Sequence, residues 1–266
     1  MRGICGKVTS AGALALVLLI SGCSTATEIA PPPSDGVFDY QLGGGYEPGD
    51  DVTVVTRDST DEPAEGLYSI CYVNGFQTQP DEAWPEALIL HEADGTRVAD
   101  PAWPAEYLLD ISTPEKRAEA AAKQSTVIER CAKSGFQAVE FDNLDSWTRS
   151  DGALTEADAV AFAVLLVDTT HGEGLAASQK NSAEMTAEGK NDIGFDFVTV
   201  EECDLFDECD EFTKAYGDQV FDIEYTDDLR GTFADVCSRV ATPARTILRD
   251  RDLVTPDSSD YVFEHC

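Results

Sequence analysis

The feature that most constrains the fold is a series of short apolar runs, rich in β-branched and aromatic residues. Eight such runs recur along the chain, at 37–42, 52–55, 68–73, 107–111, 136–141, 174–178, 195–200 and 220–225. Several are apolar almost throughout, as parallel strands buried on both faces are. The pattern predicts an α/β fold built around a parallel sheet.

Helical segments separate the later runs. Residues 113–133 begin with a capping Thr113 and carry proline in the first turn, and 155–171 begin with Thr155 as cap. Weaker helical patterns cover 181–190, 205–216 and 227–240. Eight strands with intervening helices in about 230 residues predict a compact (β/α)8 TIM barrel, a single domain over 37–266. A doubly wound sheet is the alternative.

The N-terminus has the pattern of a targeting segment. A basic start precedes a short apolar core at 11–20, and the sequence Ile-Ser-Gly-Cys that ends at Cys23 resembles a bacterial lipobox. We therefore expect a lipoprotein signal peptide over 1–22, lipid on Cys23, and a bacterial membrane lipoprotein whose domain faces the extracytoplasmic side. Plain signal cleavage and a retained anchor are the alternatives, but the apolar run is short for a membrane span. Residues 23–36, rich in Pro, Ser, Thr and Ala, predict an extended tether.

The chain is strongly acidic, with 51 acidic and 18 basic residues and a net charge of -33. Nucleic acid is therefore not an expected partner, because a binding face needs a basic patch. A cationic substrate would be attracted, although acidity can also serve solubility alone. Contact with a membrane is expected only through the lipid, and we expect a monomer.

Six cysteines follow Cys23, and an even number in an exported chain predicts disulfides. They are Cys71, Cys131, Cys203, Cys209, Cys237 and Cys266. Six cysteines allow fifteen pairings, which sequence does not decide. We expect Cys203–Cys209 first, because the two bracket a short loop, and then Cys71–Cys131 and Cys237–Cys266. A zinc site is weakly supported, since the chain has only three histidines and no Cys-x-x-Cys.

Polar side chains gather where the runs end, and a barrel enzyme presents its chemistry at the carboxyl ends of its strands. The plainest case is the buried run 136–141, which is followed by Asp142, Asn143 and Asp145. Other run ends carry Gln41, Asp58, Tyr72, Asn74, Asp110, Lys180, Asn181, Glu201, Glu202, Glu224 and Tyr225. Such a ring of carboxylates, amides and tyrosines suits a polyhydroxylated substrate or one that carries ammonium groups.

The sequence gives little support for nucleophilic-triad or phosphate-loop chemistry. The three histidines fall in loops or at a helix end, so a nucleophilic triad has little support. The glycines at 43–45 lack the flanking Lys-Ser/Thr of a phosphate loop. We expect no cofactor and no metal. A pair of carboxylates remains, and two carboxylates are the minimum equipment of glycoside hydrolysis.

Several motifs resemble, in their order and spacing, those of one known family. They are Tyr-Gln-Leu at 40–42, Ile-Cys-Tyr-Val-Asn-Gly at 70–75, Trp-Pro-Ala-Glu-Tyr-Leu-Leu-Asp-Ile at 103–111, Val-Glu-Phe-Asp-Asn-Leu-Asp at 139–145, Lys-Asn at 180–181, Val-Glu-Glu-Cys at 200–203 and Val-Phe-Asp-Ile-Glu-Tyr at 220–225. This set resembles the endo-α-1,4-polygalactosaminidase family of glycoside hydrolases, a group of (β/α)8 barrels. Two departures are Gln179, where the family more often has an apolar residue, and the stretch 75–101, which lacks the family's arginine-bearing loop.

The resemblance implies endo-hydrolysis of α-1,4-linked galactosamine chains, with Asp142 and Glu201 as the catalytic carboxylates. One would protonate the leaving oxygen and the other would act as nucleophile or base, from the tips of the fifth and seventh strands. Glu224 is the reserve acid. The residues expected to bind substrate are Gln41, Tyr72, Asp110, Asn143, Asp145, Lys180, Asn181, Glu224 and Tyr225.

Structural roles are the competing interpretation of these residues. Lys180 could form an ion pair in the barrel mouth, and the tyrosines, Trp103 and Trp147 could pack in the core instead of stacking on sugar. For the whole protein, the expected partner is a cationic amino-sugar polysaccharide. The alternatives are a non-catalytic carbohydrate-binding lipoprotein and a hydrolase of another α-linked glycan. A shared cleft with two carboxylates within about 10 Å would favour hydrolysis.

Overall fold

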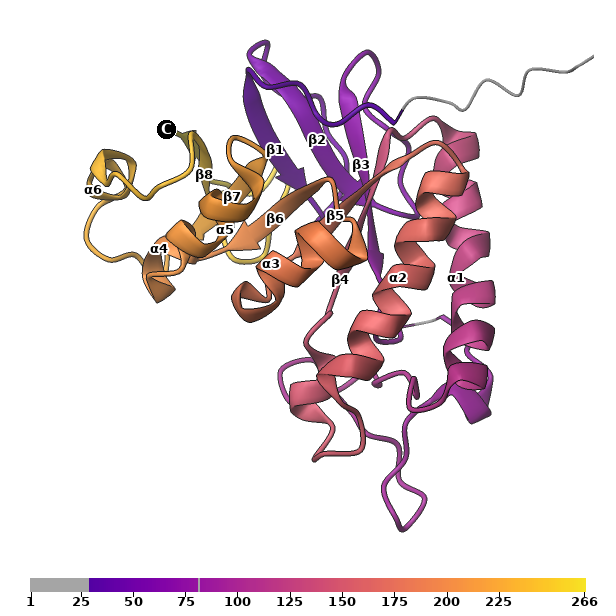
Figure 1. Cartoon of the computed structure of the whole chain (residues 1–266). Coiled ribbons are helices and arrows are strands. Elements are labelled where there is room, and N and C mark those ends of the chain that lie inside the picture. The colour runs from indigo at the N-terminus through magenta and orange to yellow at the C-terminus, as the bar shows by residue number, and fades with distance from the viewer. Residues whose placement is uncertain (1–28, 81) are drawn as a thin grey trace, which may run out of the picture.

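The computed structural model describes residues 29–80 and 82–266, so the predicted signal peptide and Cys23 lie outside the described residues. Nine strands form one sheet in chain order (Figure 1). They are β1 Val37–Gln41, β2 Val52–Asp58, β3 Tyr68–Asn74, β4 Ala138–Asp142, β5 Ala176–Lys180, β6 Phe197–Glu201, β7 Val220–Tyr225, β8 Arg245–Arg249 and β9 Phe263–His265. Neighbours from β1 to β8 pair in parallel, and β9 pairs antiparallel with β8.

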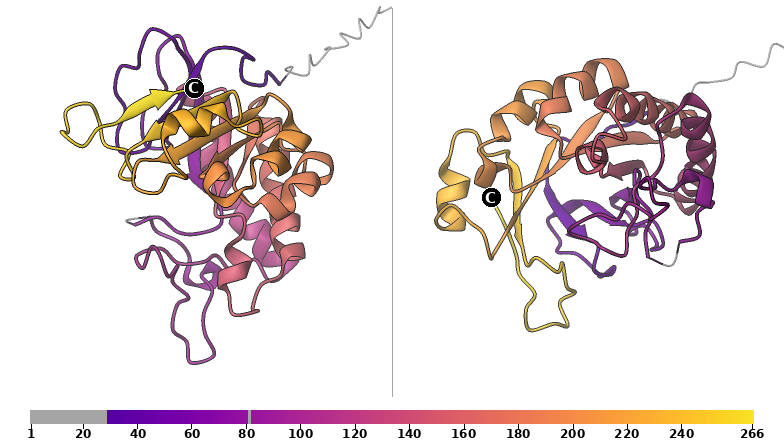
Figure 2. Two further views of the ribbon diagram at one scale, coloured as in Figure 1. Left: turned by 90° about the vertical axis from the view of Figure 1, so that its left-hand side faces the viewer. Right: turned by 90° about the horizontal axis from the view of Figure 1, so that it is seen from below.

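Helices lie outside the curved sheet, as Figure 2 shows. They are α1 Pro114–Ser134, α2 Glu156–Gly172, α3 Thr186–Glu188, α4 Cys203–Phe206, α5 Cys209–Tyr216 and α6 Phe233–Ser238, with short helical turns η1 Glu86–Leu88, η2 Ser146–Arg149, η3 Ala183–Met185 and η4 Gly189–Ile193. Thr113 caps α1, and Thr155 forms a capping box at the start of α2, as the sequence predicts. The expected TIM-type barrel of parallel strands is confirmed, with the ring nearly closed.

Side chains alternate between the inside of the barrel and the helices because successive residues of a strand face opposite ways. The inner apolar cluster includes Phe38, Val54, Ile70, Ala138 and Phe221. A larger cluster fills the space between the strands and the outer helices. Both faces of the sheet are therefore buried, which explains the nearly continuous apolar runs.

One strand predicted from the sequence is wrong, and one barrel strand was missed. Residues 107–111 form only isolated bridges inside the long connection between β3 and α1, where Leu108 and Leu109 are fully buried. The eighth barrel strand is instead β8, which begins and ends with arginine and so lacks an apolar pattern. In consequence Asp142 and Glu201 end the fourth and sixth strands, not the fifth and seventh.

Part of the predicted tether packs against the barrel. Ile29 contacts the inner apolar cluster and Pro32 is buried. The Tyr68 hydroxyl donates to the Ala30 carbonyl at 2.8 Å, and Gln219 Nε2 donates to the Pro32 carbonyl at 3.2 Å. Because Tyr68 and Gln219 lie where β3 and β7 begin, residues 29–33 cover the amino-terminal end of the barrel, and this part of the tether is not free.

All three expected disulfides are present. Cys71–Cys131 joins β3 to α1, Cys203–Cys209 joins α4 to α5, and Cys237–Cys266 joins α6 to the residue after β9.

None of the helices within the described ranges combines the length and apolar composition that crossing a bilayer requires.

Arg249 links the first and eighth strands. Its side chain is fully buried, its Nη1 lies 3.3 Å from Asp39 Oδ1, and the same nitrogen donates to the Tyr40 carbonyl. Its other nitrogens donate to the Val262 and Val254 carbonyls at 3.0 and 3.1 Å. One guanidinium therefore ties β1 to β8 and to the C-terminal segment.

Replacing this guanidinium tests its role. Arg249→Met should lower the free energy of unfolding by about 3–5 kcal/mol, because Asp39 would stay buried without its counter-charge. Urea unfolding followed by circular dichroism measures the loss. Arg97→Met is the matched control, since Arg97 pairs with Glu86 at the surface and should matter little. Equal stability of the two variants would contradict the assigned role.

Candidate active site

A cleft of about 610 Å³ opens at the carboxyl ends of the strands. Six of the predicted site residues line it, namely Tyr72, Asp142, Asn143, Lys180, Glu201 and Tyr225. The other lining residues are Tyr40, Leu42, Gly43, Asp58, Gln79, Trp103, Glu106, Glu202, Arg251, Asp252 and Leu253. The strand ends that the barrel rule singles out therefore share one cleft.

Three consecutive strands end in the same local geometry. Asp142, Lys180 and Glu201 are the last residues of β4, β5 and β6. Each is followed by a residue with left-handed backbone, namely Asn143 (φ 64), Asn181 (φ 49) and Glu202 (φ 59). Asparagine tolerates this conformation, whereas glutamate rarely adopts it. The sharp turns leave the three charged side chains at the rim of the barrel.

Lys180 brings the two carboxylates together. Its Nζ lies 2.7 Å from Glu201 Oε2 and 3.6 Å from Asp142 Oδ1. The two oxygens are therefore no more than about 6.3 Å apart, the sum of those contacts. The Asp142 and Glu201 side chains are 20% and 27% exposed, so both face the cleft. The two carboxylates therefore share one cleft, close enough to act on the same glycosidic bond.

The charges of these groups depend on one another. Burial by itself would lower the pKa of Lys180, but Asp142, Glu201 and Glu140 raise it far above its usual value. Burial opposes ionisation of Glu201, yet the charge and hydrogen bond of Lys180, with help from Tyr225 and Asn181, lower its pKa to about 2. Without ligand, Glu201 is therefore an anion and Lys180 a cation at neutral pH.

Two tyrosines fix the carboxylates. The Tyr72 hydroxyl donates to Asp142 Oδ2 at 2.7 Å, and the Tyr225 hydroxyl donates to Glu201 Oε1. Burial, reinforced by the neighbouring carboxylate, raises the pKa of both phenols well above the usual value. Both hydroxyls therefore keep their protons and act as hydrogen-bond donors that orient the acids.

A second layer beneath the rim was not predicted. Glu140 lies two residues before Asp142 on the inner face of β4, is fully buried, and accepts a hydrogen bond from the Tyr40 hydroxyl at 2.8 Å. Burial raises its pKa to about 7, although Lys180 opposes this shift. The sequence could have indicated Glu140, because it is a lone glutamate inside an apolar strand. It lies two residues from Asp142, and strand residues two apart face the same side of the sheet.

Four predicted site residues do not line the cleft, and each contacts other residues of the protein instead. Gln41 is buried and bonds Asp39, Arg57 and the backbone of Tyr46. Asp110 belongs to no barrel strand, and it accepts from Ser112 and pairs with Lys116 at the start of α1. Asp145 pairs with Arg149. Asn181 holds Glu201, accepting from its backbone N–H at 2.8 Å and donating to its carboxylate at 3.3 Å.

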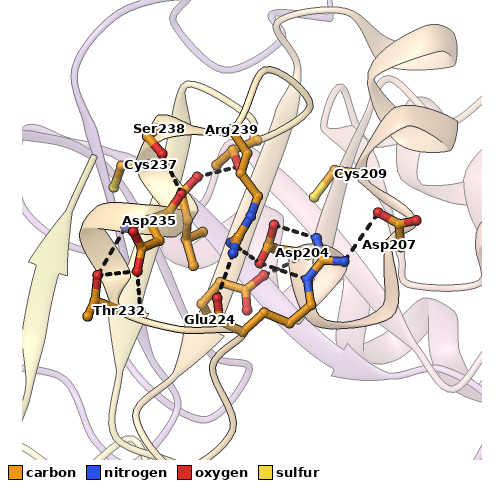
Figure 3. A network of polar contacts seen from close by, with 12 residues as sticks. Asp204, Asp207, Cys209, Glu224, Thr232, Asp235, Cys237, Ser238 and Arg239 are labelled. Carbon is orange, nitrogen blue, oxygen red and sulfur yellow. Dashed lines mark hydrogen bonds and ion pairs between the residues drawn. The ribbon is translucent and has the colours of Figure 1, made fainter.

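Glu224 points away from the cleft. The residues on either side of it, Ile223 and Tyr225, belong to the inner cluster, so its own side chain faces α4. It accepts from the backbone N–H of Asp204 at 2.8 Å, in the polar network with Arg239 that Figure 3 shows. Burial raises its pKa to about 7. The expectation that Glu224 could be a reserve acid at the barrel mouth is therefore wrong.

One group of potential metal ligands occurs in the described part of the chain. The sulfurs of Cys203 and Cys209 and a carboxylate oxygen of Asp222 lie within 4.8 Å of one another. The two sulfurs are bonded to each other, so neither is a thiolate that could coordinate a metal. The group does not fit a metal centre in this oxidised form.

Comparison with known proteins identifies relatives of this architecture. The profile of Glycoside-hydrolase family GH114 matches residues 21–266. The crystal structure of Aspergillus fumigatus Ega3 in complex with galactosamine has a TM-score of 0.71 at 20% identity, covering 90% of this chain and 98% of that one. The structure of the glycoside hydrolase domain of PelA from Pseudomonas aeruginosa has a TM-score of 0.55 at 18% identity, covering 86% of this chain and 98% of that one. No curated protein sequence matches significantly.

The pKa of Glu140 generates a prediction about stability. A carboxyl with a folded pKa near 7 and an ordinary value of 4.5 stabilises the fold fully below pH 4.5, and this contribution disappears as pH rises through 7. The stability of Glu140→Gln relative to the parent should therefore increase by about 3 kcal/mol at most as pH rises across that window. Urea unfolding from pH 4 to 8 measures this difference. Glu129→Gln, on the exposed part of α1, is the control, and parallel curves for Glu140→Gln and the parent would contradict the assignment.

Proposed function

Because this chain belongs to glycoside-hydrolase family GH114, we propose that it cleaves polysaccharide containing α-1,4-linked galactosamine by endo-attack. The observation that carries the proposal is the pair Asp142 and Glu201, held within about 6.3 Å by Lys180 in one cleft. Two carboxyls on either side of a glycosidic bond are what hydrolysis requires. The galactosamine named in the Ega3 complex supports this choice of sugar.

The chemistry uses the two acids in separate roles. One carboxyl protonates the glycosidic oxygen as the bond to the anomeric carbon breaks, and the other attacks that carbon or takes a proton from the attacking water. Tyr72 and Tyr225 keep the carboxylates oriented. Lys180 holds Glu201 ionised in the free protein, so for Glu201 to act as the acid, substrate must first weaken that ion pair.

The charge of the cleft supports a cationic polymer. Its lining includes Asp58, Glu106, Asp142, Glu201, Glu202 and Asp252, against the cations Lys180 and Arg251. Lys180 is paired with Glu201 and Arg251 with Glu202, so an excess of carboxylates faces the bound chain. A net charge of -33 also attracts cations from a distance. These features favour the amine form of the sugar over its N-acetylated form.

We also propose that Cys23 carries lipid and anchors the protein on the extracytoplasmic side of a bacterial membrane. The support is the lipobox-like sequence and the packing of residues 29–33 on the amino-terminal end of the barrel. Only residues 24–28 separate Cys23 from the packed segment. In this arrangement the barrel stands close to the membrane and the cleft, at the other end of the strands, faces away from it.

The proposed catalysis is tested by removing each acid. Asp142→Asn and Glu201→Gln should each lower the rate of cleavage of de-N-acetylated galactosaminogalactan by about a thousandfold or more. Each should also lower the melting temperature, because buried Lys180 loses a counter-charge, so the rates are compared at a temperature where circular dichroism shows both variants folded. The release of shortened oligomers measures the rate. Glu224→Gln is the control and should keep its activity, because its carboxyl faces α4. Full activity of both acid variants would refute the proposal, and cleavage of a different α-linked glycan in a substrate panel would correct the substrate alone.

Lipidation is tested on the full-length chain in a bacterial host. Cys23→Ser should abolish incorporation of labelled palmitate and move the protein from the membrane fraction to the soluble fraction. Ser24→Ala, at the next position, is the matched control and should leave both unchanged. Label retained in Cys23→Ser would disprove the site.

A further inference from the structure

Trp103 stands out among the exposed side chains. Three large hydrophobic residues are exposed in the described part of the chain, namely Trp103, Phe206 and Val240, and of these only Trp103 lines the cleft. Its side chain is 65% exposed. A single exposed apolar residue needs no explanation by itself. An indole at the rim of a polysaccharide cleft does suggest a ligand, because its flat apolar face matches the C–H face of a pyranose ring.

The turn that carries Trp103 is held rigidly. Asp100 Oδ1 accepts from the backbone N–H groups of Ala102 and Trp103 at 2.8 and 3.2 Å. The side chain of Asp100 is only 4% exposed, and its Oδ2 lies 2.8 Å from both Arg149 Nε and Gln77 Nε2. A buried, doubly anchored carboxylate therefore fixes the backbone of the turn that presents the exposed indole. Such preorganisation reduces the entropy lost when a ligand binds.

A carboxylate accompanies the indole. Glu106 closes the same turn through its backbone N–H, which donates to the Trp103 carbonyl at 2.8 Å, and its side chain also lines the cleft. Glu106 Oε2 accepts from Asn74 Nδ2 at 2.8 Å, whereas Oε1 has no hydrogen-bond donor among the described residues. Asn74 in turn accepts from Asn143, the neighbour of Asp142, at 2.9 Å. This chain of bonds sets the position of Glu106 relative to the catalytic pair.

We propose that Trp103 and Glu106 form a sugar subsite beside the catalytic carboxylates, in which the indole packs on one pyranose ring and Glu106 Oε1 accepts from that sugar's ammonium group. The inference rests on the proposed function and deepens it, because it assigns residues that bind the polymer away from the bond that breaks. The apolar contact adds affinity for any ring, and the charge-assisted hydrogen bond selects the amine form.

Binding to an inactive protein tests the subsite. In the Glu201→Gln background, calorimetry measures affinity for galactosamine and for its α-1,4 oligomers of increasing length. Adding Trp103→Ala should weaken binding of the longer oligomers roughly fivefold to tenfold and leave the monosaccharide unaffected. Trp103→Phe should recover most of the loss. Phe206→Ala, an exposed aromatic outside the cleft, is the matched control and should change nothing.

Glu106 has its own test with the same oligomers. Glu106→Gln should weaken binding of the amine form several-fold and leave the N-acetylated form unchanged, because only the amine offers a cation. Equal weakening of both forms would overturn the assignment of Glu106 to the ammonium group.

The outcomes separate this inference from the proposed function. Oligomer binding that Trp103→Ala does not weaken would overturn the subsite and leave the hydrolase proposal standing. A folded Glu201→Gln protein that binds none of the galactosamine oligomers would overturn both.

Discussion

The charge of Lys180 is the constraint on which the site depends. An ammonium group that is 2% exposed is costly to bury unless anions surround it, and three carboxylates do so here, those of Asp142, Glu201 and Glu140. The lysine ends β5, Asp142 and Glu140 belong to β4, and Glu201 ends β6. Pairing these strands therefore brings the two proposed catalytic acids together at the same time, so the stability of the barrel mouth and its proposed chemistry have one physical cause.

A second buried cation, also compensated by a carboxylate, links the first and eighth strands, where the ring is nearly closed. Where β1 and β8 meet, buried Arg249 contacts Asp39, the Tyr40 carbonyl and the C-terminal segment. Although the chain has only 18 basic residues against 51 acidic ones, three basic side chains are buried within the described ranges, namely Lys180 in the cleft, Arg249 at the seam and Arg245 at the start of β8. The surface keeps most of the negative charge, which suits the proposed cationic polymer substrate.

Three of the predicted residues that line the cleft share one property, since Asp142, Lys180 and Glu201 each end a short buried strand. Strand ends are visible in sequence because polarity changes abruptly there. Glu140 was missed because it lies inside the strand, and β8 because its arginines conceal an apolar pattern. Asp110 was misplaced because 107–111 is apolar for a different reason, namely burial within the long connection before α1.

By itself, the sequence determined the class of fold, because strand periodicity is local, and it predicted from the family resemblance the two acids that the structure brings into one cleft. The disulfide pairing it could only suggest. The tertiary structure alone decided which way Glu224 points, that Glu140 and Tyr40 lie beneath the acids, and that Trp103 and Glu106 share the rim with them. Those facts depend on strand register and on which loop lies over which strand, and both arise from contacts between residues far apart in the chain.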